Sequence, residues 1–333
     1  MKRGWAALAL LMTSCAGPQS SLDPAGVQAS RIHHLWWLFV GISLFVYVAV
    51  LAVLAWGSRR RSPSPPTPVI RPDATTERKL KLTVSSAMAF SVALLFLLLF
   101  SDFLTGRALH TLSDPVAAKI LVVGRQWWWE FRYDDISPSN VLTTANELHL
   151  PIGRPVQLEL ESRDVIHSFW VPNLHGKRDL IPGHTARIFL QADRPDTYWG
   201  QCAEYCGYQH ANMRFTVTAE PEDDYQKWLV SQRADAAEPT TDQQRRGKQV
   251  FLGATCVMCH TIQGTISQAK LGPDLTHVGS RPWIGAGALT NTRANLAGWI
   301  ANPQRAKPGS RMPPNPLPSE NLLALVDYLE SLK

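Results

Sequence analysis

Two long apolar runs near the N-terminus constrain the fold of this chain more than any other feature. Leu35–Trp56 is nearly all apolar, and Leu82–Leu104 carries no ionisable residue before Asp102. Each run is long enough to cross the roughly 30 Å hydrocarbon core of a bilayer as a helix. Tryptophans lie near the ends of the first run, as interfacial anchors do. Core helices of a soluble protein are the alternative, but the lengths and the flanking charges favour a transmembrane hairpin within residues 16–110.

The positive charge of the chain is concentrated between these two runs. The net charge is +6, and seven basic residues against two acidic ones lie between Arg59 and Lys81. Loops on the cytoplasmic side of a membrane are enriched in lysine and arginine. The sequence therefore predicts a membrane protein whose N-terminus and residues after Thr105 lie on the outer face. Because the surplus of positive charge lies in this loop between the two apolar runs, it does not indicate a nucleic-acid-binding surface, and no nucleic-acid partner is expected.

Residues 1–15 have the pattern of a secretory signal. A basic start precedes an apolar run to Met12, and small residues follow up to Cys15. Residues 13–17 read Thr-Ser-Cys-Ala-Gly, which also looks like a bacterial lipoprotein cleavage box. In that case Cys15 would become the lipidated N-terminus of the mature chain. An ordinary signal peptide with a chance cysteine is the alternative.

A different pattern begins at Ile120, with short runs rich in β-branched and aromatic residues that are broken by Pro, Gly and Asp. The runs are Ile120–Val123, Trp127–Tyr133, Glu147–Leu150, Val156–Leu160, Arg187–Leu190 and Phe215–Thr218. Regular short strands with turn signals predict a β-sandwich or barrel over residues 111–225. Functional side chains are then expected in loops at one end, held by the strands beneath them.

One loop of this domain collects soft metal ligands. Residues 201–213 read Gln-Cys-Ala-Glu-Tyr-Cys-Gly-Tyr-Gln-His-Ala-Asn-Met. Sulfur combined with imidazole favours copper, and a mononuclear blue-copper loop needs only one Cys. Two thiolates at this spacing can bridge two copper ions, with His210 at one end and a distant histidine, His167, at the other. A disulfide between Cys202 and Cys206 is the alternative in an exported domain, but it leaves the clustering of soft ligands unexplained.

Residues 164–168, Asp-Val-Ile-His-Ser, followed by Cys-x-Glu-x-Cys-Gly-x-x-His-x-x-Met, resemble the binuclear CuA site of cytochrome c oxidase subunit II. The resemblance implies copper ligation by five side chains and by the backbone carbonyl of Glu204. The five side chains are those of His167, Cys202, Cys206, His210 and Met213. In the family the carboxylate at the position of Glu204 also reaches a magnesium ion at the border with subunit I.

Three further segments are similar to the same family. Residues 124–129, Gly-Arg-Gln-Trp-Trp-Trp, resemble the segment over the copper site, where the first tryptophan, here Trp127, receives electrons. An ordinary core or anchor role is the alternative for Trp127. Residues 177–183 resemble the loop that faces subunit I, with Asp179 as a candidate interface residue. The Glu that often starts the family's second span is replaced by Thr83, which puts that proton path in doubt.

A second centre is predicted near the C-terminus. Cys256-Val-Met-Cys259-His260 is the C-x-x-C-H signature, in which both thiols bind a c-type haem covalently and the histidine ligates its iron. A chance match or a redox dithiol is the alternative. Residues 271–275 and 309–314 resemble the haem-supporting and axial-methionine loops of class I cytochromes c. The resemblance implies Met312 as the distal ligand, with His277 as a competing candidate.

Helices are predicted around this motif at residues 242–252 and 320–332, within a cytochrome c domain over residues 242–333. A further helix is predicted at residues 221–233, at the end of the preceding domain. A linker of small residues follows at 234–241, so the segment 226–241 consists of the end of this helix and the linker. We expect such a linker to act as a tether from which the cytochrome c domain docks repeatedly.

The resemblance covers nearly the whole chain and implies a multidomain fold: a transmembrane hairpin, an all-β cupredoxin-like Greek-key barrel and an all-α class I cytochrome c domain. This order resembles subunit II of a bacterial caa-type cytochrome c oxidase, a proton-translocating enzyme with oxygen as terminal acceptor. It implies binuclear CuA, one covalent haem c and a border magnesium. The implied partners are subunit I, other oxidase subunits, and cytochrome c or a quinol-oxidising complex as donor. The electron-entry subunit of a CuA-containing nitric oxide reductase and a membrane-tethered electron carrier are the alternatives.

Overall fold

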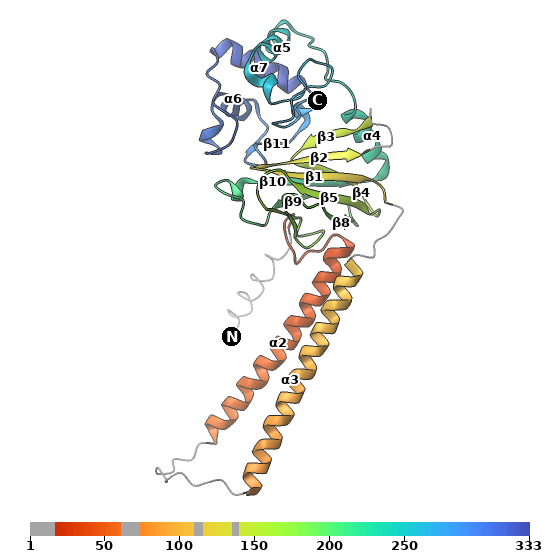
Figure 1. The fold of residues 1–333 in the computed structure, drawn as a ribbon, viewed down its shortest axis with the longest axis vertical. Coiled ribbons are helices and arrows are strands. Elements are labelled where there is room, and N and C mark those ends of the chain that lie inside the picture. The colour runs from red at the N-terminus through yellow and green to blue at the C-terminus, as the bar shows by residue number, and fades with distance from the viewer. Residues whose placement is uncertain (1–16, 61–73, 110–115, 135–139) are drawn as a thin grey trace, which may run out of the picture. The chain divides into compact units, whose positions relative to one another are not determined.

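A computed structural model describes residues 17–60, 74–109, 116–134 and 140–333. The chain divides into two compact units, one of Arg31–Thr111 and one of Met1–Ser30 with Leu112–Lys333. Figure 1 shows the elements of each unit and the labels used below. The predicted signal sequence with Cys15 and much of the basic loop lie outside the described residues.

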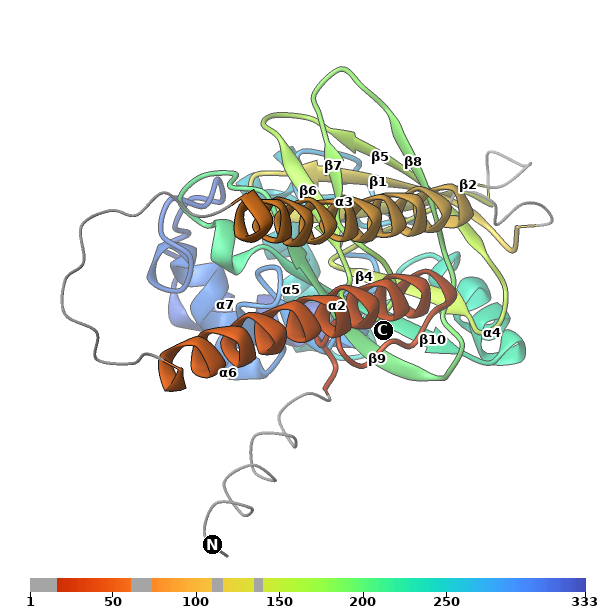
Figure 2. The ribbon, with the colours of Figure 1, turned by 90° about the horizontal axis from the view of Figure 1, so that it is seen from below.

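Two long helices make up the smaller unit and contain both predicted apolar runs. Helix α2 spans Val27–Arg59 and helix α3 spans Ala74–Leu109, and they run in opposite directions (Figure 2). They meet at Phe45 and Phe90, whose ring centroids lie 6.4 Å apart. By length and composition both helices can cross a membrane. No described residue of α3 is buried, so its apolar surface needs lipid or an apolar protein partner.

The larger unit begins with two five-stranded sheets. The first has the strand order β3-β2-β1-β5-β8 and the second β4-β10-β9-β6-β7. The first sheet consists of β1 (Lys119–Arg125), β2 (Trp128–Asp134), β3 (Leu142–Ala145), β5 (Val156–Ser162) and β8 (Ala186–Leu190). The second consists of β4 (Glu147–Pro151), β6 (His167–Trp170), β7 (Arg178–Leu180), β9 (Asp196–Cys202) and β10 (Arg214–Glu220).

All six strands predicted from the sequence are confirmed, whereas β3, β6, β7 and β9 were not predicted. Three of these four have only three or four residues, and β9 contains a glycine, which strands disfavour. Gly200 is required in β9, because a Cβ there would lie 2.1 Å from Cζ of Phe215. Phe215 packs with Trp129 and Phe169 at centroid distances of 5.3 and 4.9 Å. This aromatic core lies between the sheets and supports the site described below.

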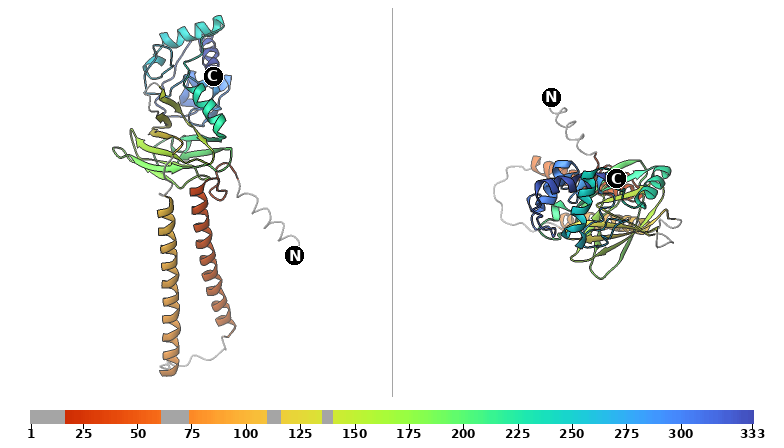
Figure 3. Two further views of the ribbon diagram at one scale, coloured as in Figure 1. Left: turned by 90° about the vertical axis from the view of Figure 1, so that its right-hand side faces the viewer. Right: turned by 90° about the horizontal axis from the view of Figure 1, so that it is seen from above.

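The cytochrome c domain follows in the same unit and gathers on one side of the sheets (Figure 3). Its helices are α5 (Asp242–Gly253), α6 (Arg293–Ala301) and α7 (Ser319–Ser331), and α4 (Glu222–Gln232) precedes them. The predicted helices are confirmed, and α6 was not predicted. A short hairpin of β11 (Trp283–Ile284) and β12 (Leu289–Thr290) adds two strands to a domain predicted to be all-α.

The linker between the two domains lies against the cytochrome c domain. The amide of Ala236 donates to the carbonyl of Gln263 at 3.2 Å, and Lys248 pairs with Glu238 at 2.9 Å. Ala236 also packs against the hydrophobic core of that domain. The structure therefore differs from the expected free tether, because the linker residues find hydrogen-bond and apolar partners on the domain they introduce.

Candidate metal and haem sites

Strand pairing brings the predicted copper ligands to one end of the second sheet. His167 is the first residue of β6 and Cys202 the last of β9. These strands are antiparallel, with Phe169 opposite Cys202. Side chains two residues apart on a strand share a face, so the imidazole of His167 lies beside the Cys202 thiol. The remaining candidates follow in the loop between β9 and β10, which we call the copper loop (residues 202–213).

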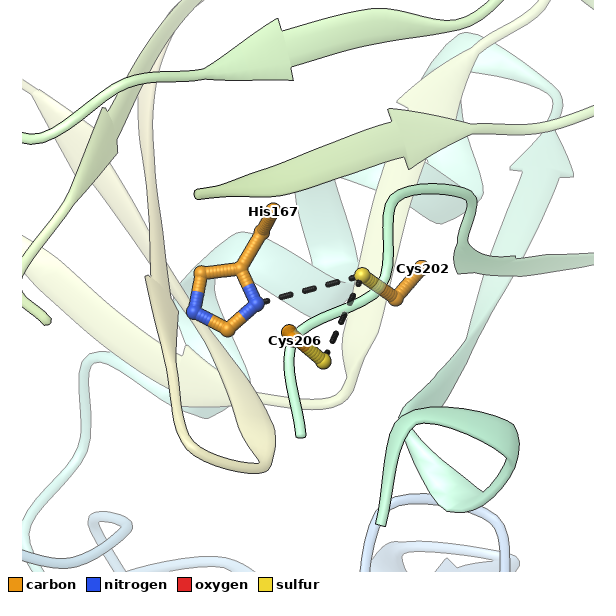
Figure 4. Close-up of side chains that lie close together, drawn as sticks. All are labelled: His167, Cys202 and Cys206. Atoms are coloured by element: carbon orange, nitrogen blue, oxygen red, sulfur yellow. Dashed lines mark hydrogen bonds between the residues drawn. The ribbon is translucent and has the colours of Figure 1, made fainter. Parts of the chain in front are cut away.

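All six predicted ligand groups converge. The Sγ atom of Cys202 lies 3.8 Å from Nδ1 of His167 and 3.8 Å from Sγ of Cys206 (Figure 4). The Cys206 sulfur lies 3.6 Å from Nδ1 of His210 and 3.8 Å from Sδ of Met213. The carbonyl of Glu204 lies 3.2 Å from the Cys202 sulfur. Both cysteines are free, and their separation is far above the roughly 2.05 Å of a disulfide.

This donor set fits a copper pair. It offers two thiols, two imidazoles, a thioether and a carbonyl oxygen, which are soft or borderline donors apart from the last. His167, Cys202, Cys206 and Met213 are buried. Nitrogen and sulfur atoms of the first three lie within 4.8 Å of one another. The two thiols would therefore hold the metal pair together with the imidazoles, of which His167 lies beside Cys202 and His210 beside Cys206.

The two thiols have opposite pKa shifts because they share one site. The hydrogen bond between the two cysteine sulfurs and the one with His167 lower the pKa of Cys202 to about 3, against the opposing effect of burial. The adjacent Cys202 sulfur and burial raise the pKa of Cys206 well above its usual range. Only the thiolate binds metal. Binding by both sulfurs therefore requires the loss of the proton that Cys206 retains.

A carboxylate behind His167 sets the orientation of its ring. Oδ1 of Asp164 lies 2.8 Å from Nε2 of His167, which directs Nδ1 toward the sulfurs. The other oxygen accepts the backbone N–H of Gln126 at 2.7 Å. Burial lowers the pKa of His167, but the hydrogen bonds to Asp164 and Cys202 outweigh it and raise the value overall. Gly124 leaves room for the ring, since a Cβ there would lie 2.8 Å from Cδ2 of His167. Sequence reasoning assigned Asp164 no role, although an acid three residues before a metal-ligating histidine was an available signal.

The predicted tryptophan segment lies over the copper loop. Nε1 of Trp127 donates to the carbonyl of Cys206 at 3.0 Å, and the Gln126 amide donates to the same oxygen at 2.8 Å. The Trp127 ring also approaches Gly207, where a Cβ would lie 3.2 Å from Cζ2. Trp127 is half-buried, whereas Trp129 is fully buried in the core. Of the three consecutive tryptophans, Trp127 therefore contacts the backbone of the copper loop while keeping an exposed edge.

The side chains predicted to face subunit I gather around one lysine. Lys177 Nζ lies 3.2 Å from a carboxylate oxygen of Glu204 and 3.6 Å from one of Asp179. All three side chains are about half exposed. In the described part of the chain, the Glu204 carboxylate belongs to no cluster of three metal-ligating side chains. The magnesium site therefore has no support within this chain beyond Glu204 itself.

The haem-attachment motif is arranged for a ligating histidine. Cys256 and Cys259 are free and half-buried. Nδ1 of His260 donates to the carbonyl of Pro273 at 2.7 Å, which leaves the lone pair on Nε2. Burial lowers the pKa of His260, and this favours the neutral, ligating imidazole. A Cβ at Gly272 would lie 2.7 Å from Cε1 of His260, so only glycine fits beside the ring. These residues fit a covalent haem c.

The two axial candidates differ in their contacts. Both ring nitrogens of His277 lie 3.1 Å from backbone carbonyl oxygens, those of Lys333 and Ala234. His277 is therefore engaged in holding the domain together. Met312 is half-buried, and its carbonyl accepts a hydrogen bond from the Gln304 amide at 3.0 Å. Its axial role stays a prediction.

Comparisons with known proteins agree with this architecture. Residues 118–220 match the periplasmic domain of cytochrome c oxidase subunit II, and residues 244–333 match cytochrome c. Cytochrome c oxidase subunit 2 of Alkalihalophilus pseudofirmus is 35% identical over 337 residues, covering 98% of this chain and 95% of the relative. The chain belongs to the cytochrome c oxidase subunit II family. It is a subunit of a haem-copper oxidase complex and carries a fused cytochrome c domain.

Shorter matches lie in the same family. Cytochrome c oxidase subunit 2 of Bacillus sp. PS3 is 31% identical, covering 66% of this chain and 64% of the relative. Among solved structures, the periplasmic domain of subunit II of the Bradyrhizobium japonicum cytochrome oxidase matches 36% of this chain and 96% of its own length. Its identity is 24% and its TM-score 0.34. The full-length match selects the oxidase over the nitric oxide reductase and the free carrier.

Proposed function

We propose that this subunit passes electrons from an external donor through its own haem c to a CuA pair and on to the oxygen-reducing site of subunit I. The donor is cytochrome c or a quinol-oxidising complex. Cys256, Cys259, His260 and Met312 would hold the haem. The CuA ligands would be His167, Cys202, Glu204 through its carbonyl, Cys206, His210 and Met213. When bound, these groups supply one-electron carriers, and the chain's residues hold them in place and exclude water.

The observation that carries this proposal is the convergence of the six candidate copper-ligand groups in one cluster, in which His167, Cys202, Cys206 and Met213 are buried. Four sulfur and nitrogen contacts of 3.6 to 3.8 Å link all five side chains. Each thiol has an imidazole beside it, His167 for Cys202 and His210 for Cys206. The fused domain, with its haem-attachment motif, supports a relay with two centres in one chain.

Trp127 is proposed as the residue through which electrons enter the copper pair. Its indole contacts the Cys206 carbonyl at 3.0 Å. Its ring also approaches Gly309 of the cytochrome c domain, where a Cβ would lie 3.9 Å from Cη2. We expect Trp127→Phe to slow electron equilibration between haem c and copper by roughly tenfold, because the bridging contact is lost. Flash photoreduction measures this rate.

The matched control for Trp127→Phe is Trp128→Phe. Trp128 is the next residue along, and its ring stacks with Arg125 at 5.6 Å rather than with the copper loop. The control should keep the parent rate. An unchanged rate in Trp127→Phe, with both centres intact by their absorption spectra, would contradict the role of Trp127.

We further propose that α2 and α3 span the bacterial plasma membrane, with both redox domains on the outer face and Cys15 lipidated. Asp179 would contact subunit I. The border magnesium stays a prediction. In this structure the Glu204 carboxylate lies 3.2 Å from the ammonium of Lys177. Within α3, Thr83 would occupy the position of the family's usual glutamate, and its hydroxyl donates to the carbonyl of Lys79 at 3.0 Å. A hydroxyl would therefore replace the usual proton-carrying carboxylate at this position.

The test of the whole proposal is the haem and metal content of the complex that co-purifies with a tagged copy of the full chain in mild detergent. We expect haem a together with haem c, and more copper than the pair on this chain. Haem b with haem c and no haem a would contradict the oxidase role. Haem c and two coppers without any partner subunit would contradict the relay to subunit I.

A further inference from the structure

A buried lysine lies where the cytochrome c domain meets the copper domain. Lys307 is only 3% exposed. Its Nζ donates to three backbone carbonyls, those of Trp127 at 2.6 Å, Asn212 at 2.7 Å and Gly285 at 3.0 Å. An ammonium has three donors, so every proton of this group is used inside the protein. A lysine buried in this way is rare, since lysine is almost never fully buried unless its charge is paired.

The three carbonyls belong to three different parts of the site. Trp127 lies over the copper loop, and Asn212 stands in that loop between two of the predicted copper ligands. Gly285 lies in the turn between β11 and β12 of the cytochrome c domain. Lys307 itself belongs to the segment 302–312, which we call the methionine loop because it ends at Met312. One side chain thus connects the loops that carry ligands of both centres.

Contacts around Lys307 show that the two domains are packed here. The amide of Gln209 donates to the carbonyl of Pro308 at 2.6 Å, and Arg311 donates to Oε1 of Gln126 at 3.1 Å. The backbone N–H of Arg214 donates to the carbonyl of Ala286 at 3.1 Å. Both direct backbone pairing and side-chain bonds therefore cross the boundary. These contacts surround Lys307 and exclude water from it.

Burial lowers the pKa of Lys307 to about 7. The ammonium is therefore destabilised by its surroundings and depends on its three carbonyl partners. Carbonyl dipoles lie around it in place of the carboxylate that a buried cation usually has. The lysine side chain fixes the relative positions of the three carbonyl groups, because all three must stay within hydrogen-bond distance of one Nζ atom.

We propose that Lys307 is a positioning residue that locks the methionine loop against the copper loop and so sets the distance between the two electron carriers. The inference rests on the proposed relay and extends it to one residue outside both ligand sets. Electron transfer between the domains then occurs in a preformed complex and needs no docking step. Small displacements of positioned redox partners cost large factors in rate.

The test compares Lys307→Met with Lys227→Met in the full chain, loaded with copper and haem. Methionine keeps the length and apolar stem of lysine but cannot donate to the three carbonyls. Lys227 is an exposed lysine of α4 that pairs with Asp224, so its variant is the matched control. Two quantities are measured. The first is hydrogen exchange over residues 205–213 and 283–287, followed by mass spectrometry. The second is the rate of electron equilibration between haem c and copper after a light flash.

In Lys307→Met we expect faster exchange in both segments and electron equilibration slowed by roughly tenfold or more. The copper and haem spectra and both midpoint potentials should stay at the parent values. Lys227→Met should match the parent in every measurement. Parent-like exchange and parent-like electron equilibration in Lys307→Met would overturn the proposal.

A second measurement needs no variant. In the parent chain, a small amine-acylating reagent should modify Lys227 within minutes and leave Lys307 unmodified. Because a lowered pKa makes an accessible amine more reactive, protection of Lys307 would report its burial between the domains. Rapid acylation of Lys307 would overturn the proposal even if Lys307→Met does not fold. Failure of the relay itself would differ, because the parent would then lack copper or haem signals while Lys307 stayed protected.

Discussion

At the scale of single residues, the copper site depends on a carboxylate that is not a ligand. Asp164 holds Nε2 of His167 at 2.8 Å and also accepts the N–H of Gln126 at 2.7 Å. We expect Asp164→Asn to lower copper affinity about 10- to 100-fold, because the neutral amide holds the imidazole less firmly and makes it a weaker donor. Competition with a copper chelator, followed at the absorption of the copper pair, measures this loss.

Asp193→Asn is the control for this change. Asp193 is exposed on the same domain and bonds to the Gln191 amide at 2.9 Å. The Asp193→Asn substitution removes the same negative charge from a residue that does not contact His167. Equal copper affinities for the two variants would mean that Asp164 acts only through its charge at a distance and does not orient the ring.

At the scale of elements, the cytochrome c domain depends on the crossing of α5 and α7. A Cβ at Gly247 of α5 would lie 2.0 Å from the carbonyl oxygen of Ala324 and 2.7 Å from Cβ of Tyr328, both in α7. We therefore expect Gly247→Ala to destabilise the domain by about 1–3 kcal/mol, because the helices must separate to accept the methyl group. Denaturant unfolding followed at the haem absorption measures the change in free energy.

Gly298→Ala in α6 tests whether the effect arises from the crossing or from helix propensity. Nothing lies within 4 Å of a Cβ at Gly298. Alanine in an exposed helix is more favourable than glycine by up to about 1 kcal/mol. The two variants should therefore shift the unfolding free energy in opposite directions. A stabilising Gly247→Ala would refute the close approach of α5 and α7.

At the scale of the whole molecule, a buried ion pair also joins the copper and cytochrome c domains. Nε of Arg281 lies 3.1 Å from a carboxylate oxygen of Glu147, and both side chains are at most 10% exposed. Thr144 donates to the same carboxylate oxygen at 2.6 Å. Arg281→Met should destabilise the larger unit by about 3–5 kcal/mol, because it leaves the Glu147 carboxylate buried without an opposite charge.

Adding Glu147→Gln to Arg281→Met should restore much of that loss. The amide removes the buried charge and still accepts the Thr144 hydrogen bond, so the double variant should unfold at higher denaturant than Arg281→Met alone. Thermal or denaturant unfolding of the full chain in detergent measures both. A double variant that is no more stable than the single one would show that the ion pair is solvated in solution.

Much of this organisation is local in the sequence and could be predicted from it. The apolar runs of α2 and α3, the six short runs rich in β-branched and aromatic residues and the C-x-x-C-H motif depend on neighbours within a few residues of one another. The proposed copper ligands Cys202, Cys206, His210 and Met213 lie close together in the sequence, so their association needed no tertiary information. Only His167 had to be brought in from a distant segment, and its resemblance to a known motif supplied it.

The sequence by itself therefore predicted most of the element types, the order of the domains and the candidate ligand residues. The tertiary structure alone decided how the domains meet. Lys307, Arg281 and Asp164 act through partners 180, 134 and 3 residues away, and no local pattern marks the first two. Their roles arise from burial, because a charged group that is excluded from water must be stabilised by the protein groups around it. That exclusion exists only once the strands, loops and helices have packed.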